Sequence, residues 1–171
     1  FGLLQKGRYL DLPIDIQLEL FDRMVVPILL YGCEIWGYES SAILEEKIHL
    51  KYCKYILGLK NSTPSCMIYG ETGRFPISLA VKARMINYWA KILCSNECKL
   101  KLVMYKVLYK YHQEGLFTSP WLKCIEQILN ECGISNVWKD QMFPNLVWLS
   151  KFIKQRTEDQ YLQSWLHTIH N

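Results

Sequence analysis

The chain lacks an apolar run long enough to cross a lipid bilayer. Its most apolar stretch, residues 24–30, is bracketed by Arg23 and Glu34 and interrupted by Pro27, whereas a membrane-spanning helix needs about 20 apolar residues. We therefore expect this stretch to be core, and we expect no membrane partner. Because proline lacks an N–H and crowds the preceding turn, a helix that begins near Pro13 is predicted to kink or restart at Pro27.

The sequence also lacks the alternation of apolar and polar residues that is typical of half-buried strands, so no sheet is expected. Apolar residues recur at helical spacing, which predicts an all-α fold, a bundle of about six to eight helices. The strongest helix prediction begins at Ser119 and Pro120 and ends before Gly133. In this segment the apolar positions 0, 3, 4, 7, 8 and 11 are Trp121, Cys124, Ile125, Ile128, Leu129 and Cys132.

Cap and stop residues predict further helices. Ser40 or Ser41 is expected to cap a helix that ends near Gly58. Residues 76–94 are expected to form a helix whose apolar band is wide enough for contact on two sides. A further helix is expected after Pro144.

Two more features concern the second half of the chain. Thr157 followed by Gln160 resembles a capping box that would open a separate last helix. The candidate boundary between two parts of the chain, which we call the seam, is at residues 113–118. We therefore expect a helical bundle in residues 1–115 and a helical extension in residues 119–171, which pack as one domain or as two lobes.

Cysteine and histidine form no disulfide framework and no strong metal motif. The seven cysteines are an odd number scattered along the chain, which suits reduced thiols in a nuclear or cytoplasmic protein. Cys94 with Cys98, and His167 with His170, are weak metal pairs because no second well-spaced couple accompanies them. We expect no metal and no cofactor in this chain, which we interpret as a fragment of a longer polypeptide because it opens on Phe1 without a leader.

No catalytic constellation is recognisable either. The sequence has no Gly-x-Ser-x-Gly motif, and Gly70 and Gly73 are not followed by the lysine of a phosphate-binding loop. Two-metal chemistry needs carboxylates that converge, but the acidic residues fall mostly on solvated helix faces or near helix N-termini, where solubility and the helix dipole explain them. The chain is therefore predicted to be non-catalytic.

The sequence concentrates positive charge in its middle part. The net charge is +4, and residues 74–110 contain eight lysines and arginines against Glu97 alone. Cations along one helix face suit a nucleic-acid duplex, because each neutralised phosphate releases counterions. The predicted nucleic-acid-binding residues are Lys47, Lys51, Lys54, Arg74, Lys82, Arg84, Lys91, Lys99, Lys106 and Lys110.

Two alternatives remain open for these cations. Lysines also decorate any solvated helix, and from the residues alone surface solubility is the favoured interpretation of these cations. Arg74 lies in a turn, where it would either contact a phosphate bidentately or pair with Glu71 and brace the turn. The favoured interpretation is that Arg74 braces the turn, because a Gly-Arg-Phe-Pro turn between two helices needs a contact that holds its conformation.

Several motifs in a fixed order resemble one protein family. Near the N-terminus these are Leu20-Phe21-Asp22, Pro27-Ile28-Leu29-Leu30-Tyr31-Gly32 and Glu34-Ile35-Trp36-Gly37. Further on these are Leu50-Lys51-Tyr52-Cys53-Lys54-Tyr55-Ile56-Leu57-Gly58, Thr63-Pro64, Ile68-Tyr69-Gly70-Glu71-Thr72-Gly73-Arg74-Phe75-Pro76, and Asp159-Gln160 with Trp165. This order resembles the region after the catalytic palm in reverse transcriptases of LINE-type (non-LTR, jockey-like) retrotransposons, and the likeness covers most of the chain. Cys33 departs from it, since a small residue such as serine is expected there.

The resemblance implies a function without a catalytic centre. The family's paired catalytic aspartates belong to an upstream Ala-Asp-Asp motif, which this sequence lacks. Residues 1–115 would then be thumb-like and would hold an RNA–DNA or DNA duplex, next to the palm domain of a parent RNA-directed DNA polymerase that uses Mg²⁺. A zinc-type Cys/His segment would follow Asn171. The alternative is a helical protein-interaction or scaffold module with no nucleic-acid role.

Overall fold

The computed structural model describes residues 12–39, 43–96 and 98–170 of the 171-residue chain. Among these residues every regular element is a helix, so the all-α prediction is confirmed. The cap predicted at Ser40 or Ser41 lies outside the described residues. The elements are α2 (Ile14–Met24), α3 (Val26–Leu29), α4 (Cys33–Trp36), the 3₁₀ turn η1 (Gly37–Glu39), α5 (Ile43–Leu57), α6 (Ser65–Thr72), α7 (Ile77–Leu93), α8 (Leu100–Gln113), α9 (Pro120–Glu131), α10 (Ser135–Asp140) and α11 (Leu146–His170).

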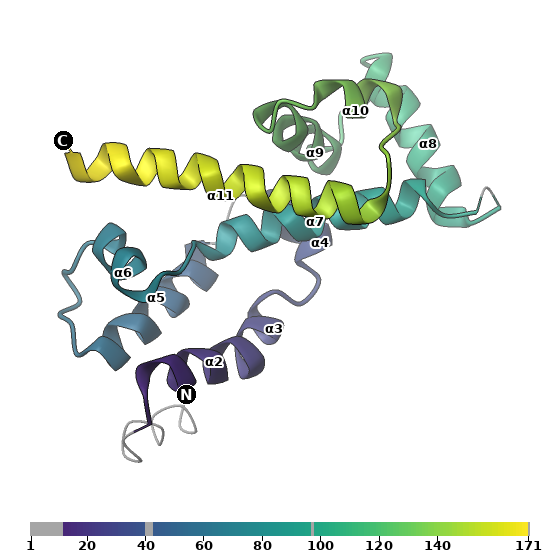
Figure 1. Ribbon diagram of the computed structural model, residues 1–171. Coiled ribbons are helices and arrows are strands. Elements are labelled where there is room, and N and C mark those ends of the chain that lie inside the picture. Colours follow the sequence, from purple (N-terminus) through teal and green to yellow (C-terminus); the bar gives the residue numbers. More distant parts are fainter. Residues whose placement is uncertain (1–11, 40–42, 97, 171) are drawn as a thin grey trace.

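The helix α7 is the centre of the fold. It contacts α4, α5, α8, α9 and α11, and its buried residues include Val81, Met85, Ile86 and Trp89. The wide apolar band predicted for residues 76–94 is therefore confirmed. Figure 1 shows α11 lying along α7 in the opposite direction, with α2, α3, α5 and α6 on one side of this pair and α8, α9 and α10 at its other end.

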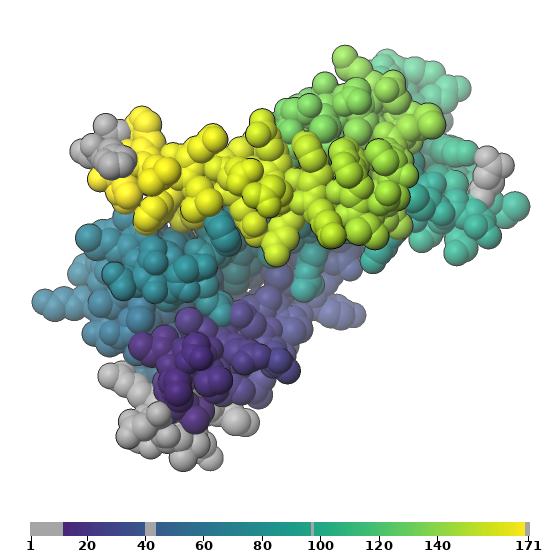
Figure 2. Space-filling model, viewed as in Figure 1, coloured from purple at the N-terminus to yellow at the C-terminus, as the bar shows by residue number. Residues whose placement is uncertain are grey.

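The buried side chains form two clusters. The larger one extends from Leu30 to Ile153 and includes residues from α7, α8, α9, α10 and α11. The smaller one joins α2, α5 and α6 around Phe21, Tyr52 and Ile68. The larger cluster crosses the seam predicted at residues 113–118, so the described parts of the two predicted segments pack against each other. In the space-filling view, the yellow C-terminal half of α11 forms the upper left edge of the molecule, and its yellow-green first half lies below the green segments (Figure 2).

The stretch around Pro27 restarts as predicted but is only half core. The helix α2 ends at Met24, and α3 begins at Val26 with Pro27 in its first turn. Leu30 and Cys33 are buried, whereas Ile28 is 74% and Tyr31 84% exposed. The expectation that the whole apolar stretch is core is therefore wrong, because a helix packed on one side buries one face whatever the composition of the other.

The capping box predicted at Thr157 is also wrong. The helix α11 runs without a break from Leu146 to His170. Within it the Thr157 hydroxyl donates to the Ile153 carbonyl at 2.9 Å, a bond to the preceding turn that lets threonine sit inside a helix. By contrast, the helix predicted from Ser119 and Pro120 is confirmed as α9.

Two findings concern bilayers and thiols. Within the described residues, no helix combines the length and the apolar character that a membrane span requires.

All seven cysteines are free thiols, and Cys33, Cys53 and Cys132 are buried while Cys94 and Cys98 are exposed.

Candidate nucleic-acid interface

The ten predicted cations lie on four parts of the fold. They are Lys47, Lys51 and Lys54 on α5, Arg74 in the loop before α7, Lys82, Arg84 and Lys91 on α7, and Lys99, Lys106 and Lys110 at the start of and within α8. Figure 1 shows α5 and α8 at opposite ends of the molecule. The structure therefore does not bring the α5 row and the α8 row onto one surface.

The α5 row contains two exposed lysines and one that is engaged within the protein. Lys47 and Lys51 are exposed. The Lys54 ammonium donates to the Asn61 carbonyl at 2.5 Å and thereby closes the loop after α5. Two cations of this row thus face solvent.

The Arg74 guanidinium braces the fold, as the favoured interpretation expected, but its partner is not Glu71. Its two Nη atoms donate to the two carboxylate oxygens of Asp22 in α2, at 2.8 and 2.5 Å. Nη2 also donates to the Leu18 carbonyl at 3.0 Å. Both Nη atoms are therefore engaged by protein acceptors, which makes Arg74 a structural residue.

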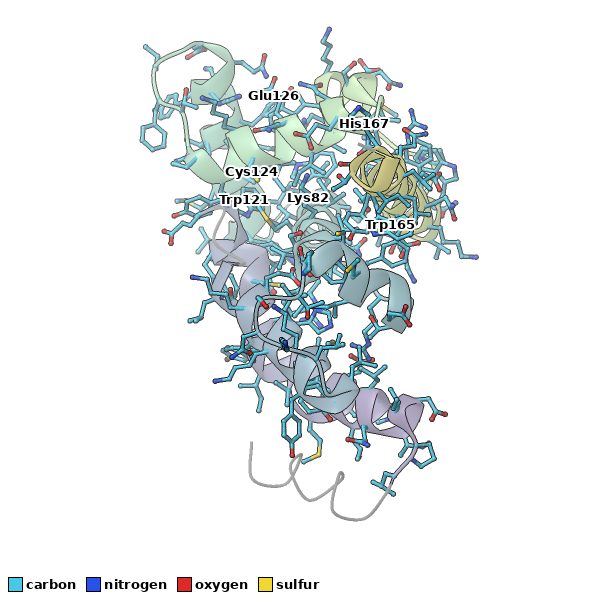
Figure 3. The ribbon with its side chains drawn as sticks, turned by 90° about the vertical axis from the view of Figure 1, so that its left-hand side faces the viewer. Lys82, Trp121, Cys124, Glu126, Trp165 and His167 are labelled. Carbon is cyan, nitrogen blue, oxygen red and sulfur yellow. The ribbon has the colours of Figure 1, made fainter. Side chains whose placement is uncertain are left out.

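Lys82 is likewise paired within the protein. Its ammonium donates to the Glu131 carboxylate of α9 at 3.0 Å, and Figure 3 shows Lys82 near Cys124 of the same helix. Burial of the Glu131 carboxyl disfavours its ionised form, but hydrogen bonds from Gln127 and Lys82 and the Lys82 charge outweigh burial and lower the pKa of Glu131. This pair joins α7 to α9.

The remaining predicted cations are more accessible. Arg84, Lys91, Lys99, Lys106 and Lys110 are all exposed. The Lys110 ammonium is 3.8 Å from the Glu114 carboxylate, one helical turn away. An exposed pair of this kind holds its lysine only weakly.

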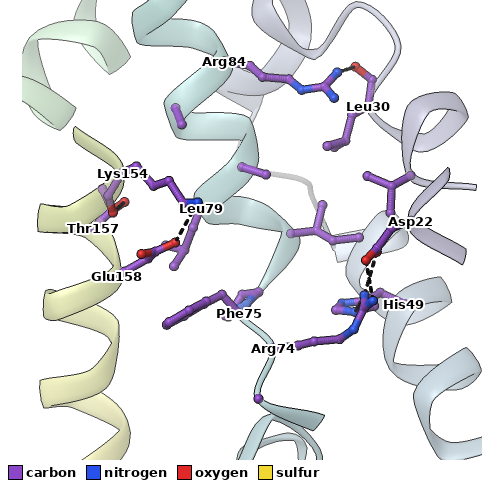
Figure 4. A pocket seen from close by; sticks show the side chains of 16 residues that line it. Asp22, Leu30, His49, Arg74, Phe75, Leu79, Arg84, Lys154, Thr157 and Glu158 are labelled. Carbon is purple, nitrogen blue, oxygen red and sulfur yellow. Dashed lines mark hydrogen bonds and ion pairs between the residues drawn. The ribbon is translucent and has the colours of Figure 1, made fainter. Parts of the chain in front are cut away.

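A groove between α7 and α11 brings two of these cations together with two that the sequence prediction missed. One cleft of ≈ 510 Å³ is lined by Arg84 of α7 and by Lys154, Thr157 and Glu158 of α11, and it extends past Arg74 to residues of α2, α3 and α5 (Figure 4). A second cleft, of ≈ 380 Å³, is lined by Lys91 of α7 and by Lys151 and other residues of α11. We call the two clefts together the α7–α11 groove.

The helical period places the two clefts one after the other along the same helix faces. The α7 residues of the first cleft include Ala80 and Arg84, and those of the second are Asn87 and Lys91. These positions, spaced 0, 4, 7 and 11, lie on one face of a helix. In α11 the residues 147, 151, 154 and 158 have the same spacing, so both helices present a single face along the groove.

Cations outnumber carboxylates in the groove. Arg84, Lys91, Lys151 and Lys154 line it together with Arg74, against the carboxylates of Asp22 and Glu158. Arg84 Nη1 donates to the Leu30 carbonyl at 3.2 Å, and this hydrogen bond holds the guanidinium toward Leu30. Lys154 lies 3.9 Å from the Glu158 carboxylate, and its side chain is 72% exposed.

The groove also suits contact with a nucleic-acid backbone in its spacing. Arg84 and Lys91 are seven residues apart, or about 10 Å along the helix axis. Measured along the axis of a duplex, this distance equals the rise of about three base pairs at roughly 3.4 Å each. Asn87 and Ser150 line the second cleft and supply uncharged donors of the type that contacts phosphate oxygens.

The missed residues, Lys151 and Lys154, had a weak signal in the sequence. They are three residues apart in the helix expected after Pro144, and this spacing places them on one face. Which face of which helix they join depends on the antiparallel packing of α11 on α7, and the sequence pattern does not encode that register. No group of three or more His, Cys, Asp or Glu side chains suited to a metal ion occurs in the described ranges.

Comparisons with known proteins assign no family. The chain matches no protein-family model, no curated protein and no solved structure. What it binds is therefore inferred from its own residues and from the motif order described above.

Proposed function

We propose that this chain is a non-catalytic, nucleic-acid-gripping part of an RNA-directed DNA polymerase from a retrotransposon, the thumb and helical extension that follow the palm. The observation that carries the proposal is the α7–α11 groove, where Arg84, Lys91, Lys151 and Lys154 line two successive clefts between the same two helices. The all-α fold and the order of the LINE-type motifs support the same assignment.

In this proposal the groove binds the backbone of an RNA–DNA or DNA duplex. Lysine and arginine contacts to phosphates position a duplex without reading its sequence, which is what a polymerase needs while the template changes. Lys91 and Lys151 approach the groove from opposite helices. Mg²⁺ and the catalytic carboxylates belong to the palm of the longer polypeptide, where the metal ions stabilise the charge of the transferring phosphate.

An exposed apolar surface supports contact with that palm domain. Met24, Ile28, Tyr31 and Ile35 are 42%, 74%, 84% and 54% exposed. They lie in the segment that resembles the one directly after the palm. Exposed apolar residues that follow one another so closely in the chain suit a segment that another domain covers.

The proposal is tested with three charge reversals matched in net charge. The groove variant is Lys91→Glu/Lys151→Glu, and the controls are Lys47→Glu/Lys51→Glu on α5 and Lys106→Glu/Lys110→Glu on α8. Affinity of the full chain for a labelled RNA–DNA hybrid is measured by fluorescence anisotropy at about 50 and about 200 mM salt. Circular dichroism confirms that each variant is folded.

The groove variant is expected to lose affinity by roughly tenfold or more at the lower salt, and its log–log salt slope should be shallower by about 1.8, or about 0.9 for each lost phosphate contact. Each control should lose much less. Equal losses in all three variants would show that binding follows net charge alone and would overturn the proposal, as would a wild-type chain that does not bind the hybrid.

A helical protein-interaction module remains the second candidate function. The observation that favours it is a row of exposed apolar side chains on α8, of which Leu100 is 74% and Met104 54% exposed. A chain that binds a protein through α8 and shows no affinity for the hybrid would fit this candidate instead.

A further inference from the structure

The helix α8 buries only one of its sides. Leu102 and Tyr105 are buried on the inner side, where the Tyr109 hydroxyl donates to the Trp138 carbonyl at 3.1 Å. On the outer side lie the residues that we call the α8 apolar row. They are Leu100, Val103, Met104, Val107 and Tyr111, which are 74%, 46%, 54%, 44% and 44% exposed.

The α8 apolar row is a continuous stripe along the helix. Its positions are spaced 0, 3, 4, 7 and 11, which places them on one face. From Leu100 to Tyr111 the row is about 17 Å long, so it offers about three turns of contact to a partner. Surface apolar residues that occur singly need no explanation, but a stripe of this kind marks an interaction surface.

Lysines flank the stripe, and the carboxylate of Glu114 at the end of the helix lies 3.8 Å from the Lys110 ammonium. Lys99, Lys106 and Lys110 follow one edge at spacings of 0, 7 and 11, and Lys101 lies toward the other edge. Residues 99–113 contain no Asp or Glu. A partner that covers the row gains from carboxylates that lie along this lysine edge, because an exposed pair such as Lys110 with Glu114 holds its lysine only weakly.

We propose that α8 docks an acidic amphipathic helix of a partner protein. The apolar face of that helix covers the α8 apolar row, and its glutamates or aspartates lie along the lysine edge, a helix-on-helix mode of recognition with anchors at helical spacing. This inference does not rest on the α7–α11 groove. A second copy of the chain paired through α8 would bring two acid-free helices together and set lysine against lysine, so charge complementarity favours a different protein.

The test uses two synthetic helical peptides of about five turns, long enough to cover α8. Both carry leucines at coiled-coil core positions, and one has glutamates and the other lysines at the flanking positions. Binding to the full chain is measured by fluorescence anisotropy. Wild type is expected to bind the glutamate peptide at least roughly tenfold more tightly than the lysine peptide.

Two variants make the result specific to α8. Val103→Ser/Val107→Ser removes two exposed methyl pairs without touching the buried side, and it should weaken glutamate-peptide binding by roughly tenfold while affinity for an RNA–DNA hybrid stays unchanged. Lys106→Glu/Lys110→Glu should invert the preference, so that the lysine peptide binds more tightly.

Several outcomes would overturn the inference. These are equal binding of both peptides, a preference that the charge swap leaves unchanged, and dimerisation of the wild type that Val103→Ser/Val107→Ser abolishes. Binding to phosphatidylserine vesicles that depends on the same two valines would assign the row to a membrane surface instead. These outcomes do not depend on nucleic-acid binding by the groove. They therefore test the α8 proposal even if the chain does not bind the RNA–DNA hybrid.

Discussion

Arg74 and Asp22 form a two-point ion pair between the loop that enters α7 and the first described helix, α2. The guanidinium donates to both carboxylate oxygens, at 2.8 and 2.5 Å, across 52 positions of the sequence. The Arg74 side chain is 17% and the Asp22 side chain 49% exposed. The planar guanidinium matches a carboxylate in geometry as well as charge, so the pair fixes where α2 lies relative to the central helix.

Replacing Arg74 with alanine is expected to lower the free energy of unfolding by about 2–3 kcal/mol, because the half-buried Leu18 carbonyl and the Asp22 carboxylate lose their donors. Arg74→Lys should cost less, about 1–2 kcal/mol, since lysine keeps the charge but not the two-point geometry. Urea unfolding followed by circular dichroism measures both.

Arg23→Ala is the matched control, because Arg23 donates to Glu19 at 2.6 Å on the exposed surface of α2. An exposed pair one turn apart contributes only about 0.3–0.5 kcal/mol. If Arg74→Ala costs no more than Arg23→Ala, the two-point pair has no structural role.

Glu46 belongs to α5 but caps the N-terminus of the central helix α7, which leads to a second prediction. Its Oε2 accepts the Ile77 N–H at the start of α7 at 2.7 Å. Its Oε1 accepts the Tyr69 hydroxyl and lies 3.2 Å from His49 Nδ1. Glu46→Gln turns one acceptor oxygen into a donor nitrogen, so it should destabilise the fold by about 2 kcal/mol, measured by urea unfolding.

An exposed pair of the same two residue types provides the control for Glu46. The Tyr38 hydroxyl donates to the Glu39 carboxylate at 3.2 Å on the surface, so Glu39→Gln and Tyr38→Phe should each leave the free energy of unfolding almost unchanged. Tyr69→Phe, in contrast, should cost about 1 kcal/mol. Equal costs at the two pairs would contradict the assignment of Glu46 as a cap.

These pairs show which parts of the structure the sequence could predict. Helical periodicity is a local property, so it predicted the all-α class and the bounds of α9. Arg74 with Asp22, and Glu46 with Ile77, are contacts between distant segments, and no local pattern contains them. The sequence singled out Arg84 and Lys91 as candidate nucleic-acid-binding residues, but their grouping with Lys151 and Lys154 depends on how α11 packs on α7.

The errors have a related cause. The apolar residues around Pro27 predicted core, yet composition does not say which face of a short helix is covered, and Ile28 and Tyr31 are exposed. Thr157 and Gln160 have the spacing of a capping box, but the flanking residues continue the helix, and the Thr157 hydroxyl bonds the turn before it. A local start signal is overridden where the neighbouring residues favour an uninterrupted helix.

Gly37 permits close packing between η1 and α7, which leads to a third prediction. A Cβ atom added at Gly37 would lie 2.5 Å from Val81 Cγ1 and 2.9 Å from Met85 Sδ. The backbone of Gly37 is ordinary, with φ −61°, so only steric overlap opposes a side chain. Gly37→Ala should therefore cost about 1–3 kcal/mol of unfolding free energy, measured by thermal or urea unfolding.

The double variant Gly37→Ala/Val81→Ala distinguishes overlap from other causes. Removing the Val81 methyl groups creates the space that the methyl group introduced at position 37 requires, so the two changes together should cost at least about 1 kcal/mol less than the sum of the single changes. Additive costs would mean that contact between these two side chains does not explain the effect.

Alkaline pH should destabilise the fold through buried thiols and phenols. Burial raises the pKa of the Cys53 thiol from its ordinary value of 9.0 to about 11, despite the opposing charge of Arg74, and burial raises the pKa of Tyr161 to about 12. Because these groups ionise more readily in the unfolded chain, their contribution to stability is fully present below pH 9 and is lost as the pH rises through their folded-state pKa values.

For Cys53 this contribution amounts to roughly 2 kcal/mol between pH 9 and pH 11. Cys53→Ala should therefore lose about 2 kcal/mol less unfolding free energy than the wild type when the pH is raised from about 8 to about 11. Cys94→Ala, which changes an exposed thiol, should show the same loss as the wild type. Urea unfolding with reducing agent at each pH measures the three losses, and identical losses in all three chains would mean that the Cys53 thiol ionises as easily in the folded protein as in the unfolded one.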